Sequence, residues 1–230
     1  MFIVYSLWFT LLTINYKPQT INQMSNIIIH PSYFPSISHF VAIAQCDLVT
    51  FEMDDHFQKQ TNRNRMYIYS PNGVQLLNIP IKHSKTGHQK TKDVKLETAF
   101  DWQKQHFKSL EAAYRTSPFF EYFEDAILPI FQKKHTFLMD LNNETLSIVS
   151  KCLGLDFDYT ETTEYFHEVA DKKDLRYLVN GKKDTSTFEK YTQVFGEKHG
   201  YLNNLSILDL LFNEGRHALA YLKRQEFFTQ

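Results

Sequence analysis

The chain has 230 residues, of which 43% are hydrophobic and 22% are charged, and such a chain can bury a proper core. Its formal net charge of −1 argues against broad, non-specific binding to nucleic acid or to anionic membranes. Seven glycines leave little material for a glycine-rich phosphate loop, and no Walker, GxGxxG, GxSxG or HExxH motif occurs.

The first 23 residues are expected to lie outside the folded domain. Their apolar run covers about thirteen residues, fewer than the roughly 20 that a membrane-spanning helix needs, and no basic residue precedes it. Met24 stands just before the first predicted strand. We therefore predict that residues 1–23 are a disordered extension or upstream sequence read from a wrong start codon, with a membrane-associating leader as the alternative. Residues 24–230 are predicted to form a single α/β domain without stable membrane insertion.

Residues 26–65 open with a βαβ pattern. A continuous apolar run at residues 27–29 predicts a strand over residues 27–30 that is buried on both faces. A Pro-rich turn follows, then a helix over residues 37–44 with Ser36 as its N-cap, and a second strand at residues 48–52. A βαβ unit implies a right-handed crossover and parallel strands.

The remainder of the chain predicts a hairpin and a helical C-terminal half. Asn72 and Gly73 supply the turn of a hairpin over residues 66–81. Helices are expected at residues 101–117 and 119–133, the second bent or broken by Pro129, and at residues 144–152, ended by Gly154. A C-terminal pair of helices completes an α/β fold in which a mostly parallel sheet, opened by the βαβ unit, carries the hairpin and the helical half.

Two local signals in the C-terminal half and two cysteines add detail. Ser206 and Asp209 have the spacing of a capping box, and Gly215 is expected to close that helix. Cys46 and Cys152 stand in apolar contexts without metal-ligand spacing. Two buried thiols fit a reducing compartment, so a cytoplasmic location is expected.

A cationic cluster follows the second strand. Lys59, Arg63 and Arg65 lie beside Asn62 and Asn64. An arginine offers a planar fork for carboxylate or phosphate, and a lysine adds a point charge. Since the chain is not basic overall, the cluster predicts a discrete small-molecule anion as partner.

The competing interpretation pairs these cations with acidic residues just upstream. Glu52, Asp54 and Asp55 stand close in sequence, and ion pairs of this sort are common. No all-protein metal site is predicted, although the three carboxylates could hold Mg²⁺ through a substrate phosphate. The cofactor is otherwise open, with a nucleotide and Mg²⁺ as one option.

Three histidines are candidates for proton transfer. His30 and His39 flank the first turn, where an open parallel sheet places its ligands and a helix N-terminus favours anions. Their arrangement is faintly similar to that of nucleotidyltransferases and pantoate ligases, although Ser38 replaces the expected glycine. Trp102 and His106 share a helix face, so Trp102 could stack on a sugar while His106 acts as acid or base. A structural role for all these rings is the competing interpretation.

Taken together, four blocks resemble the WbqC-like family, whose members occur in bacterial surface-polysaccharide (O-antigen type) gene clusters. The resemblance runs from about residue 27 to residue 222. The blocks are Pro31-Ser32-Tyr33-Phe34-Pro35; Phe57 through Arg65; Trp102 and His106 with Tyr114 and Ser117-Pro118-Phe119-Phe120; and Leu205 through Gly215. Many relatives have Pro where this chain has Arg216, and Gln or another residue where it has His30.

The resemblance implies a setting, glycan assembly, more than a reaction. The favoured function is a transferase-type enzyme that acts on an anionic, nucleotide- or acyl-linked substrate. Tyr33, Lys59, Asn62, Arg63, Asn64, Arg65 and Trp102 would bind it, and His30, His39 or His106 would move protons. Nucleotidyl transfer and acyl or aminoacyl transfer both remain open. The alternative is a non-catalytic protein that binds a partner of the polysaccharide-assembly system. The oligomeric state does not follow from the sequence.

Overall fold

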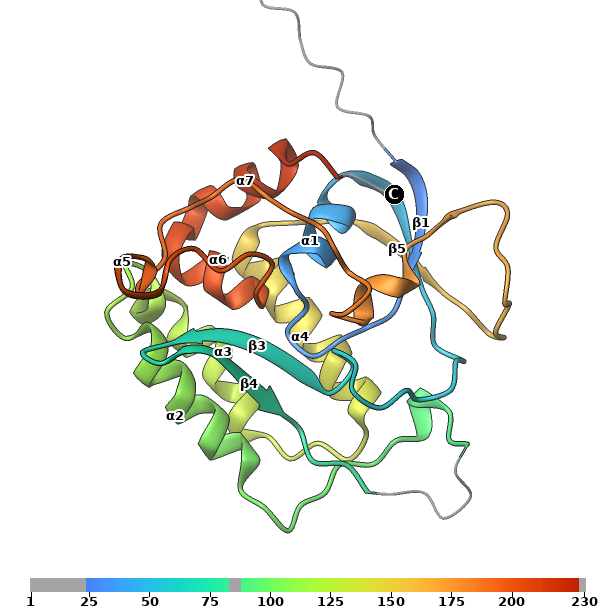
Figure 1. The fold of residues 1–230 in the computed structure, drawn as a ribbon. Helices are drawn as coiled ribbons and strands as arrows, with labels where there is room; N and C mark the ends of the chain where they lie inside the picture. Colours follow the sequence, from blue (N-terminus) through green and yellow to red (C-terminus); the bar gives the residue numbers. More distant parts are fainter. Residues whose placement is uncertain (1–23, 83–87, 228–230) are drawn as a thin grey trace, which may run out of the picture.

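The computed structural model describes residues 24–82 and 88–227, and the larger of the two sheets in these ranges is a four-stranded parallel sheet (Figure 1). The strands are β1 (Met24–Ile29), β2 (Cys46–Phe51), β5 (Asp158–Glu161) and β6 (Lys173–Asp174), in the order β5-β2-β1-β6. All three neighbouring pairs are parallel. The prediction for residues 1–23 falls outside the described residues.

The βαβ unit forms as predicted and sets the geometry of the sheet. The side chains of Ile27 and Ile29 are buried, and helix α1 (Ile37–Ala44) packs against both β1 and β2. Ile29 pairs with Phe51, so the two strands end at the same edge. From β1 the chain proceeds outward to β2 and β5, and it then returns to the other side of β1 as β6. The strand order therefore reverses between β1 and β6, where open α/β sheets bind their ligands.

The predicted hairpin is a separate two-stranded sheet. Strands β3 (Arg65–Ser70) and β4 (Gly73–Asn78) pair antiparallel, and Gly73 has a φ of 95° at the turn, which glycine adopts without strain. Helix α2 (Trp102–Tyr114) packs against β3, and helix α3 (Phe120–Gln132) packs against α2. The hairpin and these helices lie beside the parallel sheet (Figure 1).

Helices α2 and α3 lie close to the predicted ranges, whereas α4 (Leu138–Leu153) begins six residues before its predicted start at residue 144. A short 3₁₀ turn, η1 (Thr91–Asp93), precedes these helices. Pro129 lies inside α3 without breaking it. Gly154 ends α4 in the left-handed conformation, with a φ of 65°, as the sequence indicates.

The C-terminal region contains the elements η2 (Arg176–Val179), α5 (Gly196–His199), α6 (Ile207–Glu214), η3 (Gly215–His217) and α7 (Ala218–Arg224). Ser206 caps α6 by accepting a hydrogen bond from the Leu208 amide, and Gly215 ends the helix. The prediction that Asp209 completes the cap is wrong. Its carboxylate is fully buried and accepts hydrogen bonds from Tyr114, Tyr191 and Gln193.

The C-terminal helices share one apolar core with α1 and with helices α2 to α4. Helices α6 and α7 pack against α1, and the starts of α1 and α6 are joined by a bridge between Ser36 and Ser206. Cys46 and Cys152 are free, half-buried thiols, and burial raises the pKa of Cys46 to about 12. In the part of the chain that the structure describes, every helix is too short or too polar to cross a membrane.

Candidate functional site

A polar cavity of about 480 Å³ opens where the strand order reverses. We call it the sheet-edge cavity. Its lining includes His30, which follows β1, and Asp174 and Arg176 at the end of β6. The other lining residues are Asp55, His56, Gln58, Arg63, Tyr165, His167, Tyr177, Val179, Asn180 and Lys183. The cavity thus occupies the position that the fold favours for a ligand.

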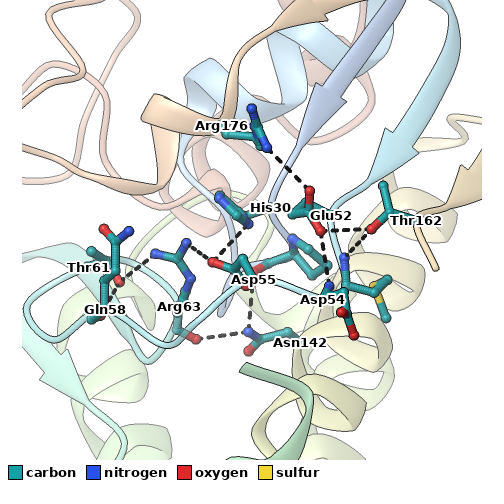
Figure 2. A network of polar contacts seen from close by, with 12 residues as sticks. His30, Glu52, Asp54, Asp55, Gln58, Thr61, Arg63, Asn142, Thr162 and Arg176 are labelled. Atoms are coloured by element: carbon teal, nitrogen blue, oxygen red, sulfur yellow. Dashed lines mark hydrogen bonds and ion pairs between the residues drawn. The ribbon is translucent and has the colours of Figure 1, made fainter. Parts of the chain in front are cut away.

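At the centre of this site lie three buried side chains, His30, Asp55 and Arg63 (Figure 2). The Arg63 Nη2 donates to Asp55 Oδ2 at 2.5 Å, and the same oxygen lies 3.6 Å from Nδ1 of His30. The Arg63 and Asp55 side chains are only 1% and 4% exposed. This ion pair therefore lies in a medium where its charges are poorly screened.

Each of these three side chains has a polar atom that makes no hydrogen bond to a described residue. His30 Nδ1, Asp55 Oδ1 and Arg63 Nε are all buried and have no hydrogen-bond partner among the described residues. Leaving such groups unpaired costs roughly 1–3 kcal/mol each. Groups of this kind are rare in stable cores and call for an explanation, of which a bound ligand or water is one.

The loop that carries Arg63 is held firmly by its backbone. The Asn62 backbone amide donates to the carbonyl of Val179 at 2.7 Å, and the Asn62 carbonyl accepts from the backbone amide of Tyr33 at 3.1 Å. The Arg63 carbonyl accepts from Nδ2 of Asn142 on α4 at 2.9 Å. These contacts join the loop to three separate segments and fix the backbone at Arg63. The guanidinium itself is held by Asp55 and by Oγ1 of Thr61, which accepts from Nη1 at 3.2 Å.

Both histidines beside the first turn are neutral near neutral pH. Burial lowers the pKa of His30 well below its usual value, and the positive charge of Arg63 lowers it further. Burial also lowers the pKa of His39 to about 4. The His39 Nδ1 lies 3.0 Å from Oγ of Ser36, while its Nε2 has no partner among the described residues. A neutral imidazole can accept a proton, which is the first requirement of a general base.

Arg176 organises the edge of the cavity through a saturated set of contacts. It donates to both carboxylate oxygens of Asp174, to the carbonyls of Phe166 and His167, and to Glu52 at 3.3 Å. Its guanidinium is consequently occupied by the protein, in contrast to that of Arg63.

Glu52 ties the end of β2 to the segment after β5 (Figure 2). Its Oε1 accepts from the Thr162 hydroxyl at 2.8 Å and from the Asp54 amide at 3.0 Å. Its Oε2 receives the contact from Arg176. Glu52 is thereby committed to holding β2, the segment after β5 and η2 together.

The structure divides the predicted cationic cluster between two cavities. Arg63 lines the sheet-edge cavity, whereas Lys59, Asn64 and Arg65 line a second cavity of about 470 Å³ near the end of β4. Asn62 lines neither cavity. Its side chain lies next to Gly181 instead.

The predicted pairing of cations with upstream carboxylates holds for one pair. Arg63 binds Asp55, as that interpretation expects. Asp54 instead binds Lys90 and Lys92, which come from beyond the hairpin. Within the described ranges, no group of three or more His, Cys, Asp or Glu side chains is arranged to hold a metal ion.

The other predicted site residues form a separate aromatic cluster. The Tyr33 hydroxyl lies 3.0 Å from Nδ1 of His106, and Trp102 contacts both rings edge to face. All three side chains are buried, and none lines the sheet-edge cavity. Burial lowers the pKa of His106 to about 4. Geometrically, this cluster packs α2 against the turn after β1.

Sequence reasoning missed the contribution of β6. Asp174, Arg176 and Lys183 belong to a stretch that reads as a polar connection, and its strand has only two residues. The one available signal was the Lys-Asp-Leu-Arg pattern, in which a single apolar residue separates charged ones.

Comparisons with known proteins place the chain in a family. The chain is 28% identical over 228 residues to Rv1507c of Mycobacterium tuberculosis (strain ATCC 25618 / H37Rv), described as an uncharacterized protein, across 85% of this chain and 96% of that protein. No solved structure matches. The model of the WbqC-like protein family matches residues 30–185, a range that contains every lining residue of the sheet-edge cavity. The chain belongs to the WbqC-like protein family.

Proposed function

We propose that the sheet-edge cavity binds an anionic, activated small molecule and that the protein transfers a group from it in cytoplasmic surface-glycan biosynthesis. The observation that carries the proposal is the buried trio of His30, Asp55 and Arg63 with three unpartnered polar atoms. The glycan setting rests on the family resemblance alone.

An anionic ligand fits the charges around the cavity. Arg63 is fixed and keeps its Nε unused, and the exposed Lys183 stands at the rim without an ion-pair partner among the described residues. A phosphate or carboxylate would gain from both, since charge-assisted hydrogen bonds are stronger than neutral ones. Asp55 neutralises part of the Arg63 charge, so the site suits one discrete anion and not a polyanion.

His30 is the group placed to move a proton. In the proposed reaction, a hydroxyl or amine of the acceptor attacks the activated carbonyl or phosphorus and gives its proton to neutral His30. The bond to the leaving group breaks, and the leaving group departs with the electron pair. Asp55, 3.6 Å from His30, would stabilise the imidazolium that forms. Acyl, aminoacyl and nucleotidyl transfer all satisfy this scheme.

The experiment begins with a thermal-shift screen of nucleotides, nucleotide-sugars and acyl carriers, because a ligand that binds the folded state raises its melting temperature. Turnover of the hit with amino- and hydroxyl-sugar acceptors is then measured for wild type, His30→Gln and His217→Gln. We expect His30→Gln to keep the thermal shift and lose turnover, and the exposed His217→Gln to keep both.

Two results would count against the enzyme. Full turnover by His30→Gln would remove the proposed base. A stable protein that binds no anion, yet is captured by a partner of the polysaccharide-assembly system, would favour the non-catalytic alternative.

A further inference from the structure

The second cavity, of about 470 Å³, has its own cations and its own aromatic ring. We call it the hairpin cavity. It lies between the loop before β3, the end of β4 and residues 97–100. Its polar and aromatic lining includes Lys59, Asn64, Arg65, Asn78, Glu97 and Phe100.

Arg65 is positioned for a ligand in a way that an ordinary surface arginine is not. Its Nε donates to Oδ1 of Asn78 at 3.2 Å, which fixes the plane of the guanidinium. The two Nη groups make no hydrogen bond to a described residue, and neither Arg65 nor Lys59 forms an ion pair within the described ranges. A guanidinium held by Nε with both Nη groups unused can meet an anion with two parallel hydrogen bonds.

Asn64 provides a second, independent indication of a ligand. Asn64 lines the hairpin cavity and is only 6% exposed. The Nδ2 donates to Asn78 Oδ1 and to the Ile79 carbonyl, but the buried Oδ1 has no partner. An unsatisfied buried acceptor beside two unpaired cations indicates a place where a hydroxyl or amino group of a ligand, or a bridging water, completes the bonding.

Glu97, the acidic residue of this lining, forms no ion pair with a cation of the described residues. Oε1 of Glu97 accepts hydrogen bonds from the backbone amides of Thr98 and Ala99, at 2.8 and 3.0 Å. These bonds hold the turn that presents Phe100. The Phe100 ring is 66% exposed, and such a ring beside a cavity can stack on a planar group.

We propose that the hairpin cavity is a second binding site, which takes an anionic group joined to a planar ring, with a nucleoside diphosphate as the form to test. Arg65 and Lys59 hold the anion, and Phe100 stacks on the ring. This site is distinct from the sheet-edge cavity because Arg63 lines one cavity while the next two residues line the other. The inference goes beyond the proposed function, since it stands whether or not His30 catalyses a transfer.

The test is calorimetric titration of the full chain with uridine diphosphate and with pyrophosphate, for wild type and four variants. We expect Arg65→Gln to weaken both ligands about tenfold or more, because it removes a charge-assisted contact. Phe100→Ala should weaken uridine diphosphate about tenfold while leaving pyrophosphate unchanged. The exposed Arg216→Gln serves as the matched control for charge and should change neither.

Lys183→Gln separates this proposal from the proposed function, because Lys183 lines only the sheet-edge cavity. If Lys183→Gln abolishes binding while Arg65→Gln does not, the ligand occupies the sheet-edge cavity and the second site is refuted. Absence of binding by wild type, or equal loss with Arg65→Gln and Arg216→Gln, would also overturn it.

Discussion

Breaking the buried ion pair between Arg63 and Asp55 should destabilise the protein strongly. Arg63→Gln leaves the Asp55 carboxylate buried and without its cation, and Asp55→Asn leaves the guanidinium likewise uncompensated. Removing one partner of a buried pair costs about 3–5 kcal/mol. Exposed pairs are worth about 0–1 kcal/mol, so the size of the effect decides whether this pair is truly buried.

The double variant should recover much of the loss. Two neutral amides at positions 55 and 63 remove both uncompensated charges, so we expect the combined cost to fall short of the sum by about 2 kcal/mol or more. The free energy of unfolding of all four proteins can be measured by urea denaturation followed by far-ultraviolet circular dichroism. Arg115→Gln, which breaks exposed pairs with Glu111 and Glu124, serves as the control.

The same variants make a prediction about His30. Burial and the charge of Arg63 lower its pKa, so Arg63→Gln should raise the pKa of His30, as read by nuclear magnetic resonance titration of labelled histidine. A cost for Arg63→Gln below about 1 kcal/mol, strict additivity in the double variant, or an unchanged His30 pKa would show that Arg63 and Asp55 do not form a buried, charge-compensating pair.

Three further predictions concern stability. Burial lowers the pKa of His106 to about 4, so below about pH 6.5 the unfolded state binds more protons than the folded state, and stability should fall as the pH drops from about 6.5 to 4, by about 2 kcal/mol near pH 5. His106→Gln should remove this loss from the pH profile of stability measured by urea denaturation, and an unchanged profile would contradict the lowered pKa. Gly215→Ala should cost roughly 2 kcal/mol or more, because φ is +55° and the new Cβ would stand 2.6 Å from the Phe119 ring; a melting temperature equal to that of wild type would exclude this clash. Asp209→Asn should cost about 2–4 kcal/mol, since an amide has a single acceptor oxygen and cannot accept both from Tyr114 at the Oδ1 position and from Tyr191 and Gln193 at the Oδ2 position. A neutral outcome in urea denaturation would argue against the buried acceptor.

Local sequence patterns were sufficient for most of the fold. The apolar run at residues 27–29, the Asn72-Gly73 turn and Gly154 each define an element through interactions between neighbours in the chain, and each is found where it was predicted. The βαβ pattern and the hairpin signal predicted the α/β class, which the parallel sheet and the separate hairpin confirm.

The predictions that missed depend on contacts between distant residues. Asp209 has the spacing of a capping residue, but its partners Tyr114 and Tyr191 come from other segments and draw it into the core. Strand β6 has two residues and no apolar period, so its place beside β1 was not visible. Arg63 and Arg65 are only two positions apart but line different cavities. Which cavity each residue lines depends on how the loop is held by other segments and not on its position in the sequence.

The central claim is that the sheet-edge cavity binds an anionic ligand, and the neighbouring lysines 182 and 183 allow the most direct test. Both are exposed, but only Lys183 lines the cavity. The measurement is the dissociation constant of the anion found by thermal-shift screening, determined by calorimetry for wild type, Lys183→Gln and Lys182→Gln. We expect Lys183→Gln to weaken binding about tenfold with no loss of stability, and Lys182→Gln to bind as wild type does. Equal affinities for all three proteins would show that the anion does not bind in the sheet-edge cavity.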